Sequence, residues 1–298
     1  MEEYISDNSL YIRSKNNSMI NRKMIGRVLG MLLFIELGMF LLCAGVSAGY
    51  GESDYKYFLY TCIINAVVGG LLLLYGRGAE NKMSRRDGYC VVTLSWVFFT
   101  FFGMLPFYFS GSIDTITNAF FETMSGFTTT GATILDDIES LSHGMLFWRS
   151  LTQWIGGLGI VFFTIAILPI FTTGGVQLFS AETTGVTHDR THPKINVMAK
   201  WLWTVYLILT VSETILLMFG GMDLFDAICQ SFATTATGGY STKQNSISYW
   251  NSPYIEYVVA IFMIISSINF SLFLMCLKGK VGRLFKDEET HWFLGSVG

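Results

Sequence analysis

Six long apolar runs, separated by polar segments, dominate the chain. They cover residues 28–48, 58–75, 89–109, 145–171, 201–220 and 254–277. An α-helix of about 20 apolar residues crosses the hydrocarbon core of a bilayer, whereas a lone strand there would leave its backbone groups without hydrogen-bond partners. The pattern therefore predicts an all-α polytopic membrane protein.

Two further apolar segments are too short to cross a bilayer. Residues 113–127 lie between the third and fourth runs, and residues 223–235 lie between the fifth and sixth. As helices they would extend about 20 Å, which is less than the roughly 30 Å of the hydrocarbon core. We expect each segment to enter the membrane and return to the same side.

The basic residues give an independent indication of topology. If there are six crossings and both short segments enter from the outer side, 16 of the 19 Lys and Arg residues fall in the inner regions. The three that remain outside are Lys56, Arg149 and Lys243. Because cytoplasmic loops collect positive charge, this pattern predicts a cytoplasmic N-terminus.

Composition narrows the class of protein further. Hydrophobic residues make up 51% of the chain and charged residues 14%, whereas soluble domains carry about 25% charged residues. The net charge of -3 does not favour a nucleic-acid partner. The five cysteines stand singly, without the spacing of a metal site, and are typical of small buried side chains. We expect no covalently bound cofactor.

The two short segments belong to an internal repeat. A shift of 108 residues places residues 119–133, AFFETMSGFTTTGAT, over residues 227–241, AICQSFATTATGGYS. Each copy consists of a span, a short apolar helix, a turn rich in Thr and Gly, and a second span. A single turn of this kind is more often an ordinary interhelical loop, but two at a fixed offset indicate a shared function.

The chemistry of this repeat favours a cation. The C-terminal end of a helix carries about half a negative charge, and glycine permits an extended turn whose carbonyl oxygens replace the water around an ion. The sequence therefore predicts a cation site formed by backbone carbonyls. The residues expected to line it are Thr128, Thr129, Thr130, Gly131, Ala132, Ala236, Thr237, Gly238, Gly239 and Tyr240.

At these residues the chain strongly resembles the membrane subunit of bacterial Trk potassium uptake systems, within the Trk/Ktr/HKT superfamily. The resemblance covers nearly the whole chain. Its motifs are residues 125–133 (SGFTTTGAT), 148–159 (WRSLTQWIGGLG), 181–185 (AETTG) and 233–242 (ATTATGGYST). It implies that Gly131 and Gly239 take the filter-glycine positions of the family.

The resemblance also implies partners and a location. Members of this family work as homodimers in the bacterial inner membrane, on a cytoplasmic nucleotide-binding ring that gates them. The loop of residues 172–194 is a candidate for part of the contact with that ring, or is an ordinary solvated connector. The function implied is potassium uptake, without enzymatic activity.

The resemblance suggests a division of the chain into four parts. Residues 1–85 resemble a leader with two transmembrane helices, residues 86–195 a first pore repeat, residues 196–288 a second, and residues 289–298 the start of a third. The family closes its pore with four repeats. We therefore expect either a fragment or an assembly of two copies.

Four side chains are expected to support the filters. Asp114 and Asp223 precede the two short helices and are candidate helix caps. Arg149 opens a span after the first filter and is expected to pair with Glu122 or with helix carbonyls.

Glu36 and Glu213 lie within spans, where a carboxylate is costly, and we expect both to be buried in hydrogen-bonded or interface positions.

Other patterns keep alternative functions open. Residues 136–139, DDIE, are similar to acidic clusters that hold Mg²⁺ and a diphosphate in membrane enzymes, but no second acidic cluster faces them. His188 and His192 have a spacing that metal sites use, without a convincing third ligand. A Mg²⁺-dependent membrane enzyme and a nonconducting two-repeat scaffold or fragment therefore remain as alternatives.

Overall fold

The computed structural model describes residues 20–79, 85–159, 194–268, 272 and 288–297. Every regular element in these ranges is a helix, in agreement with the all-α prediction. Three single helices are at least 18 residues long and apolar enough to cross a membrane, and a fourth candidate joins two consecutive helices across Arg86–Ser110. The fold is therefore that of a polytopic membrane protein.

The chain begins with an antiparallel pair of long helices, α2 (Arg22–Gly49) and α3 (Tyr55–Tyr75). They approach closely at Gly30, where a Cβ would lie 2.8 Å from the carbonyl oxygen of Gly69. Between them, Asn65 Nδ2 donates a hydrogen bond of 3.0 Å to Glu36 Oε2. Glu36 is fully buried, as the sequence predicted.

A first group of helices follows the pair. It consists of α4 (Arg85–Gly103), α5 (Leu105–Ser110), α6 (Ile116–Phe127) and α7 (His143–Gly157). The sequence predicted one helix over residues 89–109, but the structure begins a new helix at Leu105. Pro106 lies in the first turn of α5, and its missing N–H removes a hydrogen bond to the preceding turn.

A second group again places a short helix between two longer ones. It consists of α10 (Lys194–Phe219), α11 (Leu224–Thr235), the 3₁₀-helix η2 (Ser246–Trp250) and α12 (Pro253–Ser267), and the helix α14 (Glu288–Val297) comes after it. The short helices α6 and α11 are 12 residues long. At about 1.5 Å per residue each extends about 18 Å, so neither is long enough to cross a bilayer.

Within the described residues, two helices stop before the ends of the spans that the sequence predicted. The helix α7 stops at Gly157, and Gly159 has a φ of 72°. Near this end, Gly156 and Gly157 lie directly against Phe127 and Ala236. The helix α12 stops at Ser267, and Ile268 is extended. Residues 160–171 lie outside the described ranges, as does most of 269–277.

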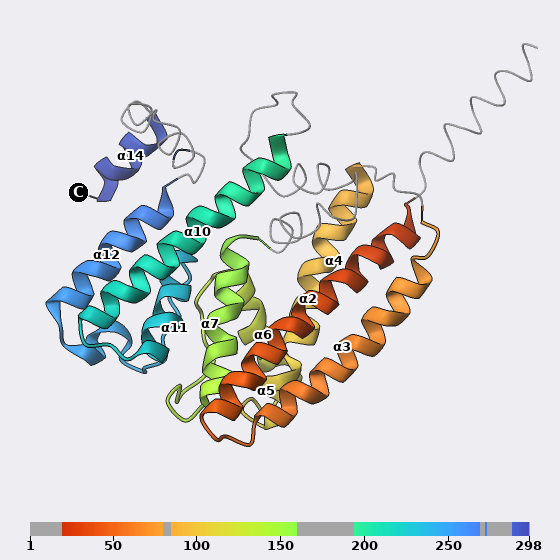
Figure 1. The fold of residues 1–298 in the computed structure, drawn as a ribbon, viewed down its shortest axis with the longest axis horizontal. Coiled ribbons are helices and arrows are strands. Elements are labelled where there is room, and N and C mark those ends of the chain that lie inside the picture. Colours follow the sequence, from red (N-terminus) through yellow and green to blue (C-terminus); the bar gives the residue numbers. More distant parts are fainter. Residues whose placement is uncertain (1–19, 80–84, 160–193, 269–271, 273–287, 298) are drawn as a thin grey trace, which may run out of the picture.

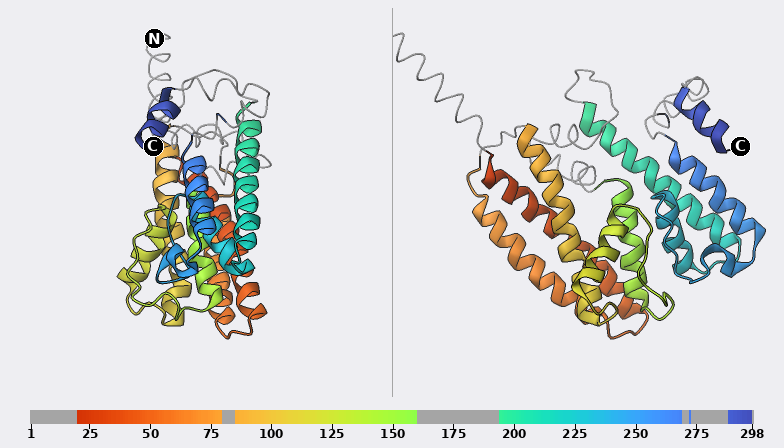
Figure 2. Two further views of the ribbon diagram at one scale, coloured as in Figure 1. Left: turned by 90° about the vertical axis from the view of Figure 1, so that its left-hand side faces the viewer. Right: turned by 180° about the vertical axis from the view of Figure 1, so that it is seen from behind.

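The helices are arranged so that equivalent ends lie together. The N-terminal ends of α2, α4 and α10 lie at one end of the molecule, and the loops that precede α3, α7 and α12 lie at the other (Figure 1). The same arrangement is visible from behind (Figure 2). Within it, α6 packs against α4 and α7, and α11 packs against α10, α7 and α12. The helix α7 therefore contacts both short helices.

Candidate functional site

The two short helices begin with different caps. Thr115 is the N-cap of α6, and its side chain accepts a hydrogen bond of 3.2 Å from the Asn118 N–H. The prediction that Asp114 caps this helix is therefore wrong, because the extended residue next to the first helical position is Thr115. The carboxylate of Asp223 caps α11, accepting from Phe225 N at 3.0 Å and Asp226 N at 3.3 Å.

Each short helix ends in the same turn. We call residues 128–132 the first loop and residues 236–240 the second loop. In the first, Thr130 N donates to Ser125 O at 2.9 Å; in the second, Gly238 N donates to Ala233 O at 2.8 Å. Donor and acceptor are shifted by 108 residues between the loops, so the sequence repeat is also a repeat of backbone structure.

Backbone dihedrals follow the same offset. Thr129 and Thr237 have φ values of 52° and 53°, and Gly131 and Gly239 have values of 76° and 81°. A positive φ is ordinary for glycine but is a genuine outlier for a β-branched residue such as threonine. Strained backbone of this kind concentrates at ligand-binding sites, so both loops are candidates for such a site.

The hydrogen bonds leave most loop carbonyls free. Loop N–H groups donate to the last carbonyls of α6 and α11. Within the described ranges no donor is hydrogen-bonded to the carbonyl oxygens of residues 128–131 or 236–240. The carbonyl of Ala132 differs, since it accepts from Ser125 Oγ at 2.6 Å. We therefore leave Ala132 out of the ion site that its sequence position suggested.

The two loops are in direct contact. A Cβ on Gly131 would overlap the carbonyl oxygen of Gly238. The Tyr240 ring is buried, with 2% of the residue exposed, and its hydroxyl donates to the Glu122 carbonyl at 2.9 Å. The second loop is thus fastened to the short helix of the first group.

Glu122 supports the first loop from behind. Its Oε1 lies 2.8 Å from Arg149 Nε and 2.9 Å from Thr133 Oγ1, and its Oε2 accepts from Ile134 N at 3.0 Å. Glu122 and Arg149 are 1% and 2% exposed. This is the pairing expected from the sequence. A buried ion pair needs such additional hydrogen bonds to offset its desolvation.

A different acid supports the segment after the second loop. Asp226 Oδ1 accepts from Thr242 Oγ1 at 2.7 Å, and its Oδ2 lies 3.3 Å from Lys243 Nζ. Partial burial acts to lower the pKa of the Lys243 ammonium, but the neighbouring Asp226 carboxylate raises it above its ordinary value. Lys243 therefore stays charged at neutral pH and neutralises Asp226.

Sequence reasoning missed the role of Gln153. It is fully buried, and its Oε1 accepts a hydrogen bond of 3.0 Å from Tyr240 N. The signal was its position four residues after Arg149, which places both side chains on one face of α7. A helix in the first group thereby contacts the backbone of the second loop.

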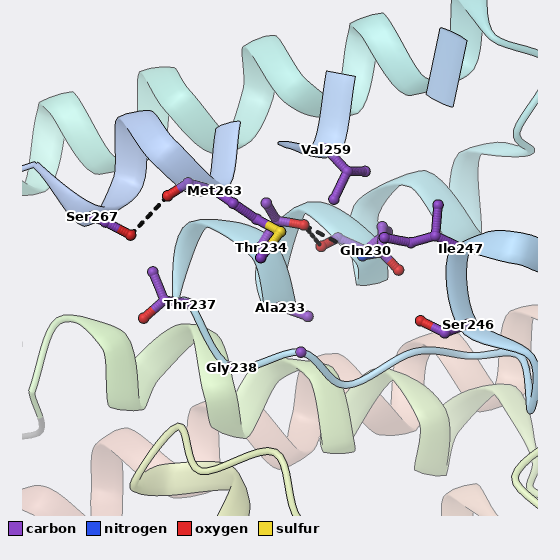
Figure 3. A pocket seen from close by; sticks show the side chains of 11 residues that line it. Gln230, Ala233, Thr234, Thr237, Gly238, Ser246, Ile247, Val259, Met263 and Ser267 are labelled. Atoms are coloured by element: carbon purple, nitrogen blue, oxygen red, sulfur yellow. Dashed lines mark hydrogen bonds between the residues drawn. The ribbon is translucent and has the colours of Figure 1, made fainter. Parts of the chain in front are cut away.

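A cavity of about 240 Å³ borders the second loop. Val259 and Met263 of α12 lie on one side of it, Gln230 and Thr234 of α11 lie between, and Gly238 lies on the other side (Figure 3). Gln230 Nε2 donates to Thr234 Oγ1 at 3.3 Å. Polar groups of α11 thus line a cavity whose wall also includes residues of the second loop.

The structure supports no metal cluster among the residues it describes. In these ranges no group of three or more His, Cys, Asp and Glu side chains is close enough to hold a metal ion. Glu139, from the acidic segment 136–139, accepts instead from Gln244 N at 3.1 Å. His188, His192 and nearly all of the loop 172–194 lie outside the described ranges.

Comparison with known proteins adds independent information. The Trk system potassium uptake protein TrkH of Escherichia coli K12 is 41% identical over 274 residues, which cover 91% of this chain and 57% of that protein. TrkG of the same organism is 31% identical over 275 residues, with the same coverage of each chain. The chain therefore spans just over half the length of these relatives.

A solved structure and a family profile agree with these relatives. The crystal structure of the potassium transporter TrkH from Vibrio parahaemolyticus superposes with a TM-score of 0.79 at 32% identity, covering 91% of this chain and 56% of that one. The profile of the TrkH family, described as cation transport proteins, matches residues 55–294. These relatives are transporters, and the chain belongs to the TrkH family of cation transport proteins.

Proposed function

We propose that this chain provides two of the ion-coordinating loops of a potassium uptake protein. Residues 128–131 and 236–240 are the two filter segments, with Gly131 and Gly239 at the filter-glycine positions. The observation that carries the proposal is the row of carbonyl oxygens, in both loops, that no donor within the described ranges engages. A partly dehydrated K⁺ ion is stabilised by such a ring of carbonyl dipoles.

Electrostatics of the short helices supports a cation as the ligand. Both α6 and α11 end at the loops, and the C-terminal end of a helix carries about half a negative charge. The positive charges nearby do not oppose this, because Arg149 is paired with Glu122 and Lys243 with Asp226. The loops therefore present a net negative potential to an ion between them.

The proposal includes the setting of the protein. The chain lies in a bacterial inner membrane with its N-terminus in the cytoplasm and both short helices entering from the outer face. Residues 1–85 form a leader, 86–195 and 196–288 form two pore repeats, and 289–298 begin a third. The complete transporter is a homodimer gated by a cytoplasmic nucleotide-binding ring.

The relatives' names support potassium as the transported ion. The Escherichia coli proteins are described as potassium uptake proteins of the Trk system. Since this chain covers 57% of their length, the loops described here supply part of the ligands of a filter. The remaining ligands come from further repeats of the complete transporter.

Uptake measurements test this function. The complete transporter that contains this chain is expressed in bacteria that lack their own potassium uptake systems, and growth at low K⁺ and rubidium uptake are measured. We expect both to be restored, with Na⁺ a poor competitor. A transporter that reaches the membrane in normal amount but supports neither growth nor uptake would contradict the proposal and favour a nonconducting scaffold.

A further inference from the structure

The helix α7 of the first repeat lies directly behind the second filter. Arg149 and Gln153 lie one helical turn apart on it, and they are 2% and 0% exposed. Both contact the segment 240–241 of the second repeat. We propose that Gln153 and Arg149 are positioning residues of the second filter, so that the first repeat sets the ion selectivity of the second. This inference rests on the proposed function.

Gln153 holds the filter backbone through its amide oxygen. The Tyr240 N–H donates to Gln153 Oε1 at 3.0 Å. At Gly238 the same side chain fills the place of a Cβ, which would lie 2.6 Å from Gln153 Nε2. Gln153 therefore fixes both the peptide that follows Gly239 and the distance of Gly238 from α7.

The amide nitrogen of Gln153 faces the first filter as well. It lies 3.8 Å from the position that a Cβ on Gly131 would take. Within the described ranges this nitrogen has no hydrogen-bond partner. Since Gly131 also touches the Gly238 carbonyl, one buried side chain lies at the junction of the two filters and is in a position to couple them.

Arg149 holds the other end of the same segment. Its Nη1 donates a hydrogen bond of 3.0 Å to the Ser241 carbonyl, and its guanidinium carbon lies 3.6 Å from the centroid of the Tyr240 ring. Its Nε is paired with Glu122 of the first repeat. One guanidinium thus joins the support of the first filter to the backbone of the second.

The corresponding positions of the second repeat carry no such groups. The helices α7 and α12 are both 15 residues long and both follow a serine, Ser142 and Ser252. With these starts aligned, Arg149 corresponds to Val259 and Gln153 to Met263. Those side chains are apolar and line the open cavity beside the second loop (Figure 3). We call Arg149 and Gln153 together the polar bracket. It is therefore a property of the first repeat and not of every repeat.

The physical consequence concerns carbonyl orientation. A peptide group is planar, so fixing the Tyr240 N–H also fixes the Gly239 carbonyl on the same peptide. Fixing the Ser241 carbonyl in the same way limits rotation of the peptide groups around Tyr240 and Ser241. If these anchors are removed, the filter carbonyls can rotate, and a site that discriminates by carbonyl number and field strength loses that discrimination.

Two variants of the complete transporter test the bracket. Gln153→Leu removes the acceptor of the Tyr240 N–H at similar size. Arg149→Lys keeps a charge for Glu122 but loses the fork that also reaches Ser241. The matched control is Thr214→Val, which removes a 3.0 Å hydrogen bond from α10 to Ser231 on α11 without touching either filter. Rubidium uptake is measured with increasing Na⁺, at matched amounts of protein in the membrane.

We expect each bracket variant to lower the preference for Rb⁺ over Na⁺ about tenfold, the change expected from one lost buried hydrogen bond. Thr214→Val should keep the wild-type preference. Wild-type preference in both bracket variants, or an equal loss in Thr214→Val, would overturn the inference. A wild-type transporter without selective uptake would instead contradict the proposed function.

Hydrogen–deuterium exchange gives a second readout that does not require transport. In the purified transporter, peptides that cover residues 236–242 should exchange faster in Gln153→Leu than in Thr214→Val, because the Tyr240 N–H has lost its acceptor. Equal exchange in these two variants would overturn the positioning role. If Gln153→Leu fails to reach the membrane, Arg149→Lys takes its place in the same comparison with Thr214→Val, because Arg149 donates to the Ser241 carbonyl of the same segment.

Discussion

Gly131 in the first loop lies against the carbonyl oxygen of Gly238 in the second, so close that a side chain at position 131 would overlap this oxygen. Among the described residues other than its own chain neighbours, no heavy atom lies within 4 Å of the place of a Cβ on Gly239. These two glycines share a positive φ, at 76° and 81°, but differ in the space around them. The same substitution at the two glycines should therefore have different effects on folding.

Replacing either glycine by serine should weaken selectivity for K⁺ over Na⁺ in the complete transporter. A side chain at a positive φ costs about 1–2 kcal/mol, which is enough to shift the carbonyls of both loops. Gly131→Ser should also lower the amount of folded protein, because it adds the overlap with Gly238, whereas Gly239→Ser should fold. Rubidium uptake against Na⁺ and the yield of monodisperse protein measure the two effects. Unchanged selectivity in both variants would exclude the filter assignment.

The Glu122–Arg149 pair should be coupled in stability. Arg149→Leu leaves the Glu122 carboxylate buried without its cation and is expected to cost about 3–5 kcal/mol of folding free energy. Adding Glu122→Gln removes the buried charge and should restore part of that loss. Thermal unfolding of the purified single and double variants, followed by tryptophan fluorescence, measures these losses of stability. If the loss in the double variant equals the sum of the losses in Arg149→Leu and Glu122→Gln alone, the ion pair is not the source of the effect.

Labelling with membrane-impermeant thiol reagents tests the re-entrant path of the first short helix. In a background without native cysteines, Ser112→Cys and Ser140→Cys flank α6 on its two sides. Both are expected to react from the outside of intact cells, since a 12-residue helix spans only about 18 Å. If either cysteine reacts only after the cells are permeabilised, so that the reagent reaches the cytoplasmic side, the topology is contradicted.

A single copy of these 298 residues should not conduct ions. In the proposed function the two loops supply about half the carbonyls of a fourfold site, so that with these loops alone K⁺ would have to shed water without replacement. Irregular backbone is also not tolerated against lipid, and the second loop borders an open cavity of about 240 Å³. Rubidium uptake by vesicles that contain the purified monomer measures this. Robust selective uptake would show that two repeats suffice.

The sequence by itself determined the class of fold and the place of the candidate site. Apolar runs of the length of a bilayer and two shorter apolar segments are local properties, because the cost of exposing backbone or charge to lipid applies to each segment separately. The repeat at an offset of 108 residues predicted two equivalent turns, and Thr129 and Thr237 have the same unusual φ. Local sequence also indicated Asp223 as a helix cap.

Only the tertiary structure decided which side chains support the loops. The repeat aligns Glu122 with Gln230, yet the acid behind the segment after the second loop is Asp226, one helical turn earlier. Gln153 contacts Tyr240 across 87 positions of sequence, and hydrophobic periodicity carries no information about such a pair. The helical ends of α7 at Gly157 and of α12 at Ser267 were likewise not visible in the apolar pattern. Apolar pattern fixes which segments enter the membrane, whereas the hydrogen-bond partners of a buried loop depend on which helices pack beside it.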